Sequence, residues 1–342
     1  GALFTQNFTT ATDSHNIAIG VNAGLSVTTG QFNTLVGGIA GDALTTGTRN
    51  VVVGYNALTT DTLGSKSVAI GLGTLQDQNF TTATDALNTA VGHGVGSSMT
   101  TGIQNTFIGG LAGDAITDAD FNVAVGYAAL GSDTLGSNST ALGWSALAAQ
   151  NFSTATLSYN TAVGFKAGLS VTSGVQNTLV GGLSGDALTQ GARNTAFGYA
   201  TLTSDTLGQY AVAIGYGALN EQNFTTATNN YNVAIGYLAG ETVSTAVQNT
   251  LVGGLVGDAL TTGGENSAFG YAALSSETTG TSNTALGNLS LLSQNGATAN
   301  TAVGYNSGRS ITTGTKNVIM GTFAGDALTD ADFNVALGWG AL

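Results

Sequence analysis

Aspartates that follow glycine are the first residues in this sequence whose type and spacing could do chemistry. Five copies of Gly-Asp-Ala-Leu or Gly-Asp-Ala-Ile contain Asp42, Asp114, Asp186, Asp258 and Asp326. Calcium-binding repeats surround an ion with oxygen atoms from successive turns. Here successive aspartates are about 72 residues apart, or roughly 19 Å along a stack of strands, so they cannot share an ion. We interpret them as turn caps.

Two further acidic patterns recur, and the second of them could contact a cation. One set recurs with the same period, at Asp61, Asp133, Asp205 and Glu277. The other places alternating carboxylates at Asp118 with Asp120 and at Asp330 with Asp332. Two carboxylates without further ligands bind a cation weakly. We therefore predict no metal and no cofactor.

Catalytic residues are not indicated anywhere in the chain. His15 and His93 have no nucleophile or metal ligand at a suitable spacing, and the many serines and threonines lack a base. Catalysis requires unlike residues that converge at one place, which would break a repeat locally. No repeat is broken in this way, so we predict that the chain is not an enzyme.

Periodic aromatic residues are the remaining candidates for binding. One column follows a recurrent glycine in every fourth repeat, at Tyr55, Tyr127, Tyr199, Tyr271 and Trp339. Such rings could stack on the faces of sugars, or they could pack between repeats or between chains. The same alternatives hold for a second column, at Phe8, Phe80, Phe152 and Phe224.

The composition limits the class of protein that must position these residues. The 342 residues include 52 glycines, no proline and no cysteine, and only 7% are charged. The net charge of −13 repels phosphate backbones and anionic lipids, so we expect neither nucleic acid nor membrane insertion. The sequence contains no signal peptide and no run of 18 apolar residues. Because it begins and ends within a repeat, we expect a segment of a longer protein.

A short repeat organises the whole chain. We call the last residue of its Asn-Thr/Val-Ala-Val/Ile-Gly pattern the marker glycine, and each repeat a rung. The marker glycines are Gly20, Gly37, Gly54, Gly71, Gly92, Gly109, Gly126, Gly143, Gly164, Gly181, Gly198, Gly215, Gly236, Gly253, Gly270, Gly287, Gly304, Gly321 and Gly338. Their spacing is 17 residues three times and then 21, and the extra residues form loops of the type QNFTTAT at Gln6–Thr12, Gln78–Thr84, Gln150–Thr156 and Gln222–Thr228.

Each column of the repeat predicts a position in the fold. Asparagine stands four residues before most marker glycines, which favours a ladder of stacked amides. The residue directly before the glycine is always large and apolar, so we place it in the core. The residue two before the glycine is alanine in most rungs and larger in every fourth, as at Leu35 and Phe107. We expect that column to form either a contact between chains or a second inner wall.

These columns predict an all-β fold, a parallel β-solenoid that occupies residues 1–342 as one repetitive domain. Each rung reads as strand, glycine turn, strand and glycine turn, and it is too small to bury a core alone. Nineteen rungs about 4.8 Å apart would make a rod of roughly 90 Å. Because small cores without disulfides commonly need oligomerisation, we expect the chain to associate with itself.

The repeat strings resemble those of two known groups of proteins. SVAIG at Ser67–Gly71, NIAIG at Asn16–Gly20 and NVAIG at Asn232–Gly236 resemble the head repeats of trimeric autotransporter adhesins. NTAVGYNSG at Asn300–Gly308, followed by TTG, is similar to repeats of bacteriophage tail fibres and bacterial surface proteins. The resemblance covers the whole chain and implies a left-handed β-roll that forms homotrimers, although the adhesin unit is shorter, at roughly 14 residues.

Together these features predict the structural shaft of an extracellular fibre, on a virion tail or a bacterial cell surface. Such a shaft would space or present a tip for host attachment, with a host glycan or receptor as a further partner. The alternative is a glycan-binding surface built on the aromatic columns. A third, less favoured class is an ice-binding solenoid, because the threonine column eight residues after the marker glycine is interrupted by asparagine in every fourth rung.

Overall fold

The computed structural model describes residues 1–342 and consists of strands and turns without any helix. The chain divides into two compact units, residues 1–173 and 174–342, which are described separately. Each unit is a parallel β-solenoid, so the predicted fold class is confirmed. No helix is present that could cross a membrane.

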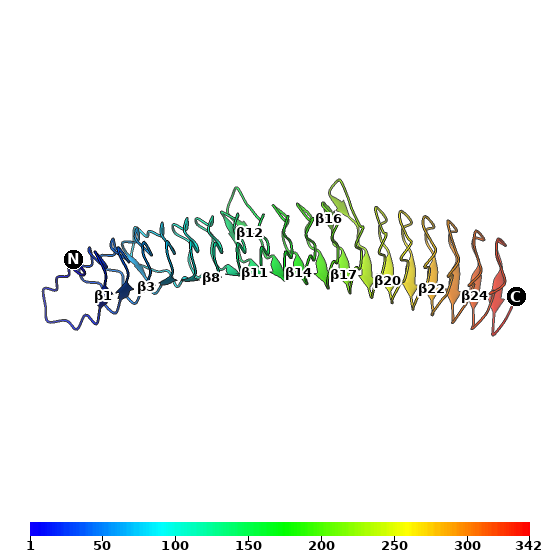
Figure 1. Ribbon diagram of the computed structural model, residues 1–342. Helices are drawn as coiled ribbons and strands as arrows, with labels where there is room; N and C mark the ends of the chain where they lie inside the picture. Colours follow the sequence, from blue (N-terminus) through cyan, green and yellow to red (C-terminus); the bar gives the residue numbers. More distant parts are fainter. The chain divides into compact units, whose positions relative to one another are not determined.

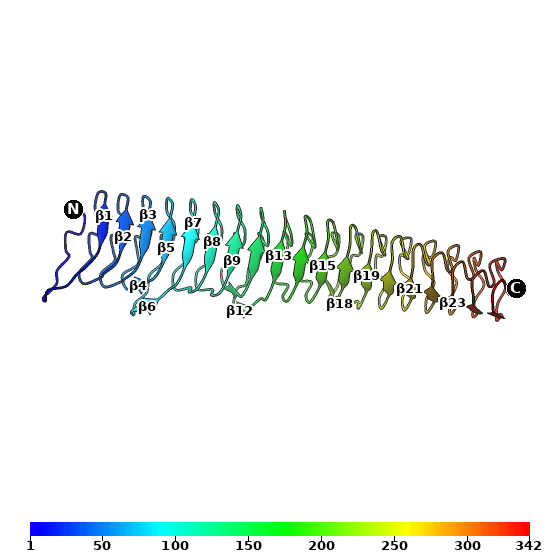
Figure 2. The same ribbon diagram turned by 90° about the horizontal axis from the view of Figure 1, so that it is seen from below.

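The first unit has nine three-residue strands, one from each rung. They are β1 (Ile17–Ile19), β2 (Thr34–Val36), β3 (Val51–Val53), β5 (Val68–Ile70), β7 (Thr89–Val91), β8 (Thr106–Ile108), β9 (Val123–Val125), β11 (Thr140–Leu142) and β13 (Thr161–Val163). Each strand lies parallel to the next, and Ala18 pairs with Leu35 and Thr34 with Val51. The register places equal positions of successive rungs side by side (Figure 2).

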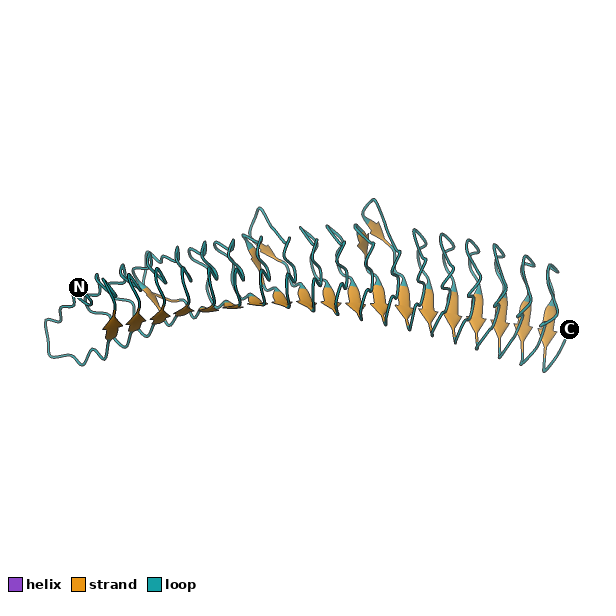
Figure 3. Ribbon diagram, viewed as in Figure 1, coloured by secondary structure: helices purple, strands orange, loops and turns teal.

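The second unit repeats this arrangement with ten strands. They are β14 (Thr178–Val180), β15 (Thr195–Phe197), β17 (Val212–Ile214), β19 (Val233–Ile235), β20 (Thr250–Val252), β21 (Ser267–Phe269), β22 (Thr284–Leu286), β23 (Thr301–Val303), β24 (Val318–Met320) and β25 (Val335–Leu337). Within each unit the strands form one wall and the turns close the other sides (Figure 3).

The long loops add short strand pairs outside the main sheets. These pairs are β4 (Gly64–Ser65) with β6 (Thr84–Asp85), β10 (Gly136–Ser137) with β12 (Thr156–Leu157), and β16 (Gly208–Gln209) with β18 (Thr228–Asn229). In Figure 1 the loops near β12 and β16 rise above their neighbouring turns. The tips of these loops, such as Thr81–Ala83, are therefore exposed, as an insertion in a solenoid should be, while the loop phenylalanines point inward.

One prediction about the core was wrong. The column directly before the marker glycine points outward, with Ile19 at 62% and Phe197 at 55% exposure. The column two before it, including Leu35 and Phe107, is completely buried, so it forms the inner wall and is not available for contact between chains. Alternate residues of a strand point to opposite faces, so a three-residue strand sends only its middle side chain inward.

The period of four rungs follows from how the two walls share the interior volume. In the second rung of a set the strand contributes Leu35, and the opposite turn has Gly41, where an added Cβ would lie 3.0 Å from Leu35 Cδ2. In the fourth rung the strand contributes Ala69 and the turn contributes the buried Leu75. The large residue thus stands on the strand in the second rung and on the turn in the third and fourth, at Leu58 and Leu75, which keeps the narrow interior filled.

The asparagine column closes each turn and connects it to the next. Asn33 Nδ2 donates to the carbonyl of Gly47 at 2.9 Å. Gly47 lies at the end of the same turn of the solenoid. Asn33 Oδ1 accepts the backbone N–H of Asn50 in the next rung at 2.9 Å. The column is therefore a ladder in which amide side chains bond mainly to backbone groups, a pattern that also satisfies buried polar atoms.

Candidate functional site

The two histidines lie in different rungs. The His15 ring stacks on the Phe32 ring with centroids 5.4 Å apart. The Arg49 guanidinium lies 5.5 Å from the centroid of the Phe32 ring. His93 is exposed in a turn. No three His, Asp or Glu side chains come together to hold a metal ion, and neither unit encloses a pocket.

The aspartates of the Gly-Asp-Ala segments occupy turns. Burial raises the pKa of the Asp42 carboxyl group, and the nearby backbone N–H groups of Asp42 and Ala43 offset part of that rise. Asp258 accepts the hydroxyl of Ser275 at 2.6 Å in the next rung. Asp258 therefore links its turn to the next rung.

The alternating carboxylates also bond to neighbouring rungs. Asp118 accepts the hydroxyl of Thr101, and Asp120 accepts the backbone N–H of Ile103 at 2.8 Å. Asp332 likewise accepts the backbone N–H of Thr315 at 2.6 Å. Oxygens that already accept hydrogen bonds from the protein are poorly placed to surround a cation.

A third set of carboxylates is buried in the interior, a position that the sequence pattern did not reveal. Asp61, Asp133, Asp205 and Glu277 all have no exposed surface. Around Asp205, Gln222 Nε2 donates at 2.7 Å, and the backbone N–H groups of Gly208 and Phe224 donate at 3.0 and 3.1 Å. Gln222 in turn accepts Asn232 Nδ2 at 2.9 Å. This arrangement neutralises no charge, but it gives each carboxylate several donors.

Acidification should favour the folded chain through Asp61 and Asp205. Burial raises the pKa of Asp61 and Asp205, and hydrogen bonds from glutamine and backbone N–H groups offset part of that rise. A raised pKa means that the folded chain binds more protons between the ordinary pKa and the raised one. Stability from Asp205 should therefore increase as pH falls through this window and stay constant above it.

The test compares the wild type with Asp205→Asn by denaturant unfolding over a series of acidic pH values. As pH falls, the unfolding free energy of the wild type should increase relative to that of the variant. Asp77→Asn, at an exposed turn position, controls for the loss of a charge. A wild type that loses stability relative to Asp205→Asn on acidification would show instead that the folded chain favours the anion.

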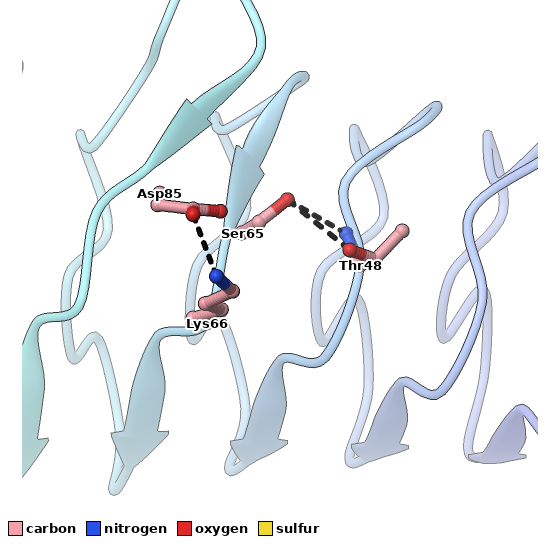
Figure 4. A network of polar contacts seen from close by, with 4 residues as sticks. All are labelled: Thr48, Ser65, Lys66 and Asp85. Atoms are coloured by element: carbon pink, nitrogen blue, oxygen red, sulfur yellow. Dashed lines mark hydrogen bonds and ion pairs between the residues drawn. The ribbon is translucent and has the colours of Figure 1, made fainter.

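The only ion pair joins a long loop to the preceding rung. Lys66 Nζ lies 2.6 Å from Asp85 Oδ2 in strand β6, and the adjacent Ser65 hydroxyl accepts the backbone N–H of Thr48 at 3.0 Å (Figure 4). Both charged side chains are partly exposed, so the pair contributes little to stability. Its role is to fix the loop against the wall.

The largest feature without a partner is the apolar outer sheet face, which we define as the outward residues of the main strands. None of these residues is charged; the last residue of every strand is apolar, and the first is threonine or serine in eleven of the nineteen strands and valine or isoleucine in the others. In the first unit its most exposed members are Ile17, Ile19, Val51, Ile108, Val123 and Leu142. In the second unit they are Phe197, Phe269, Leu286, Val318, Met320, Val335 and Leu337.

The tyrosine column borders this face at the turn after the marker glycine. All its members are exposed, and in two of them an aromatic ring of the next rung covers one ring face. Tyr127 stacks on Trp144 with centroids 6.3 Å apart, and Tyr199 stacks on Tyr216 at 5.7 Å. On the other side each tyrosine lies over a glycine of the preceding rung, such as Gly182, whose added Cβ would be 3.3 Å from the Tyr199 ring.

This geometry limits what the aromatic columns can bind. Stacking on a sugar needs an open ring face, whereas the stacked rings offer mainly their edges. Trp339 in the last rung is the most exposed member, and Tyr271 has Asn288 in place of an aromatic residue in the next rung. Phe80, Phe152 and Phe224 in the long loops are buried, and Phe152 lies against Gly136.

The threonine column eight residues after the marker glycine uses its hydroxyl groups within the solenoid. Thr28 Oγ1 donates to the carbonyl of Thr45 at 3.2 Å, and Thr45 Oγ1 donates to that of Thr62 at 3.0 Å. Where asparagine interrupts the column, Thr62 Oγ1 bonds to Asn79 Oδ1. These hydroxyl protons are therefore not free to bind an ordered array of water.

Comparison with known proteins gives no family for this chain: no family model, curated protein or solved structure matches it significantly.

Proposed function

We propose that the chain is the structural shaft of a homotrimeric extracellular fibre, either a phage tail fibre or a bacterial surface adhesin, that presents a tip for host attachment. The parallel solenoid fits a shaft, because rungs can be added without changing the fold. The resemblance of its repeat strings to those of adhesin heads and tail fibres also supports this function. The fold by itself is compatible with several functions.

The observation that carries the proposal is the apolar outer sheet face. In each unit its exposed members and the bordering aromatic residues together present on the order of 1,000 Å² of apolar surface, since an aromatic side chain alone offers roughly 150–250 Å² when fully exposed and these side chains are about half exposed. Monomeric soluble proteins rarely expose more than a few hundred Å² in one patch. A stable interface needs about 800 Å² from each partner, so this face is large enough for one.

A second copy of the same chain is the partner that fits this face. The face is uncharged, whereas the chain as a whole carries −13, so copies would approach best along the strip that has no like charges. Self-association also suits a thin interior built largely from single inward side chains. The number three comes from the resemblance, and the geometry supports association in general.

Light scattering on the full chain tests the proposal. The wild type should have the mass of a trimer, and Ile108→Lys with Phe269→Lys should shift it towards monomer, because each lysine would be buried without a partner. Ser132→Lys with Ser276→Lys adds the same charge at exposed turn positions outside the sheet and should leave the mass unchanged.

Two outcomes would contradict the proposal. A wild-type chain that is monomeric at all concentrations, with its strands intact by circular dichroism, would exclude a homotrimer. Equal dissociation by the sheet and turn substitutions would show that the outer sheet face is not the interface. Binding of such a monomer to glycans or to ice would then support the alternative functions.

A further inference from the structure

A single Asn-Gly pair occurs in the chain, at Asn295 and Gly296. It occupies the place that Asn-Phe holds in the long loops, at Asn79, Asn151 and Asn223. All four asparagines lie in the same column, in a turn next to a buried carboxylate. The four sites therefore share one environment, and they differ mainly in the residue that follows.

The preceding rung contacts both reacting groups of this pair. It donates a hydrogen bond to the side-chain carbonyl of Asn295 and accepts one from the backbone nitrogen of Gly296. Thr278 Oγ1 donates to Asn295 Oδ1 at 2.6 Å. The backbone N–H of Gly296 donates to Glu277 Oε1 at 2.7 Å. Asn295 itself is exposed, so water can reach its side chain.

The geometry points to Asn295 as a site of spontaneous covalent modification by succinimide formation. The nitrogen of Gly296 attacks Cγ of Asn295, the Asn295 side-chain nitrogen leaves as ammonia, and the amide proton passes to a base. Water then opens the ring at either carbonyl, which gives aspartate or isoaspartate. The net change exchanges one ammonia for one water and needs no oxidant or reductant.

Two contacts promote this reaction. The Thr278 hydroxyl points at the oxygen on which negative charge develops when the nitrogen attacks, as an oxyanion donor does. The Glu277 carboxylate lies within reach of the proton that the nitrogen must lose. Because the N–H bond lies in the peptide plane, this hydrogen bond leaves the face of the nitrogen free for the attack.

The equivalent Asn-Phe sites lack these advantages. Their N–H to carboxylate distances are 3.4, 3.4 and 3.1 Å, and their threonine to asparagine distances are 3.2, 3.0 and 3.2 Å. The phenylalanine side chains are also buried, which fixes the backbone that would have to move. Gly296 has no side chain and has a φ of +75°, so its backbone is less restricted.

Incubation of the folded full chain in mildly alkaline buffer, followed by peptide mapping and isoaspartate detection by methyltransferase labelling, tests the inference. Asn295 should convert at least about tenfold faster than Asn79, Asn151 and Asn223, and faster than it does in the denatured chain. Conversion of Asn295 only in denaturant, with an intact residue in the folded chain, would show that the fold protects it and would overturn the inference.

Substitution of Thr278 separates the effect of the folded geometry on the conversion rate from the effect of the Asn-Gly sequence itself. Thr278→Val removes the hydroxyl but keeps the shape, and it should slow conversion by about tenfold in the folded chain. Thr278→Ser keeps the donor and should restore the rate. Equal rates for the three folded proteins would exclude the proposed role of the hydroxyl, and the denatured chains serve as the common reference.

Discussion

Replacing Gly54 by alanine is expected to destabilise the first unit by at least about 3 kcal/mol, one of the largest effects that a single methyl group can have. Gly54 has a φ of +145°, a region that only glycine adopts readily. An added Cβ would also lie 2.2 Å from the carbonyl oxygen of Gly71 in the next rung. Backbone atoms cannot move aside without breaking the sheet between β3 and β5.

Thermal or denaturant unfolding of Gly54→Ala and of Gly73→Ala measures this effect. Gly73 also has a positive φ, but its added Cβ meets only Gln76 Oε1, at 3.5 Å. The control should therefore lose only about 1 kcal/mol, the cost of the backbone conformation alone. Similar losses for both variants would mean that close contact between rungs is not what requires the marker glycine.

Replacing Gln222 by leucine is expected to cost about 3 kcal/mol, because it leaves the buried Asp205 carboxylate without its side-chain donor. Asn232 loses its bond to Gln222 in the same step, although it keeps a bond to the carbonyl of Ala246 at 2.7 Å. The measurement is the unfolding free energy from denaturant titration at neutral pH.

The double variant Asp205→Leu with Gln222→Leu provides the matched control. It removes the charge together with its donor and leaves an apolar column that is continuous with the buried Leu188 and Val243 of the adjoining rungs. It should be more stable than Gln222→Leu alone, since removing both partners of a buried pair costs less than removing one. If the two effects simply add, Gln222 does not stabilise the fold through Asp205.

The fold could be predicted from the sequence because a stack of identical rungs repeats its residues in register. The marker glycines gave the rung length, and the pairing of Ala18 with Leu35 follows that period directly. The direction of the side chains could not be predicted in the same way. Size alone suggested that Ile19 lies inside and left the place of the alanine column open, but a strand of three residues has only one inward position.

The candidate sites were only partly predictable, for a different reason. The period of Asp61, Asp133 and Asp205 was visible, yet aspartate is rarely fully buried, so the pattern gave no reason to place it in the interior. What makes burial tolerable is a glutamine one rung later together with backbone donors, and these become neighbours only when the chain coils. The covered ring faces of the tyrosine column likewise depend on adjacent rungs.

Two features of the interior recur every four rungs. They are the alternation of large residues between the strand and the turn, and the buried pair of a carboxylate and a glutamine. Loss of one rung after Asp61 would remove Gln78 and place the carboxylate against an apolar side chain such as Met99. Loss of four consecutive rungs would restore every neighbour to its former kind. The chain can therefore change its length without losing stability only in steps of four rungs.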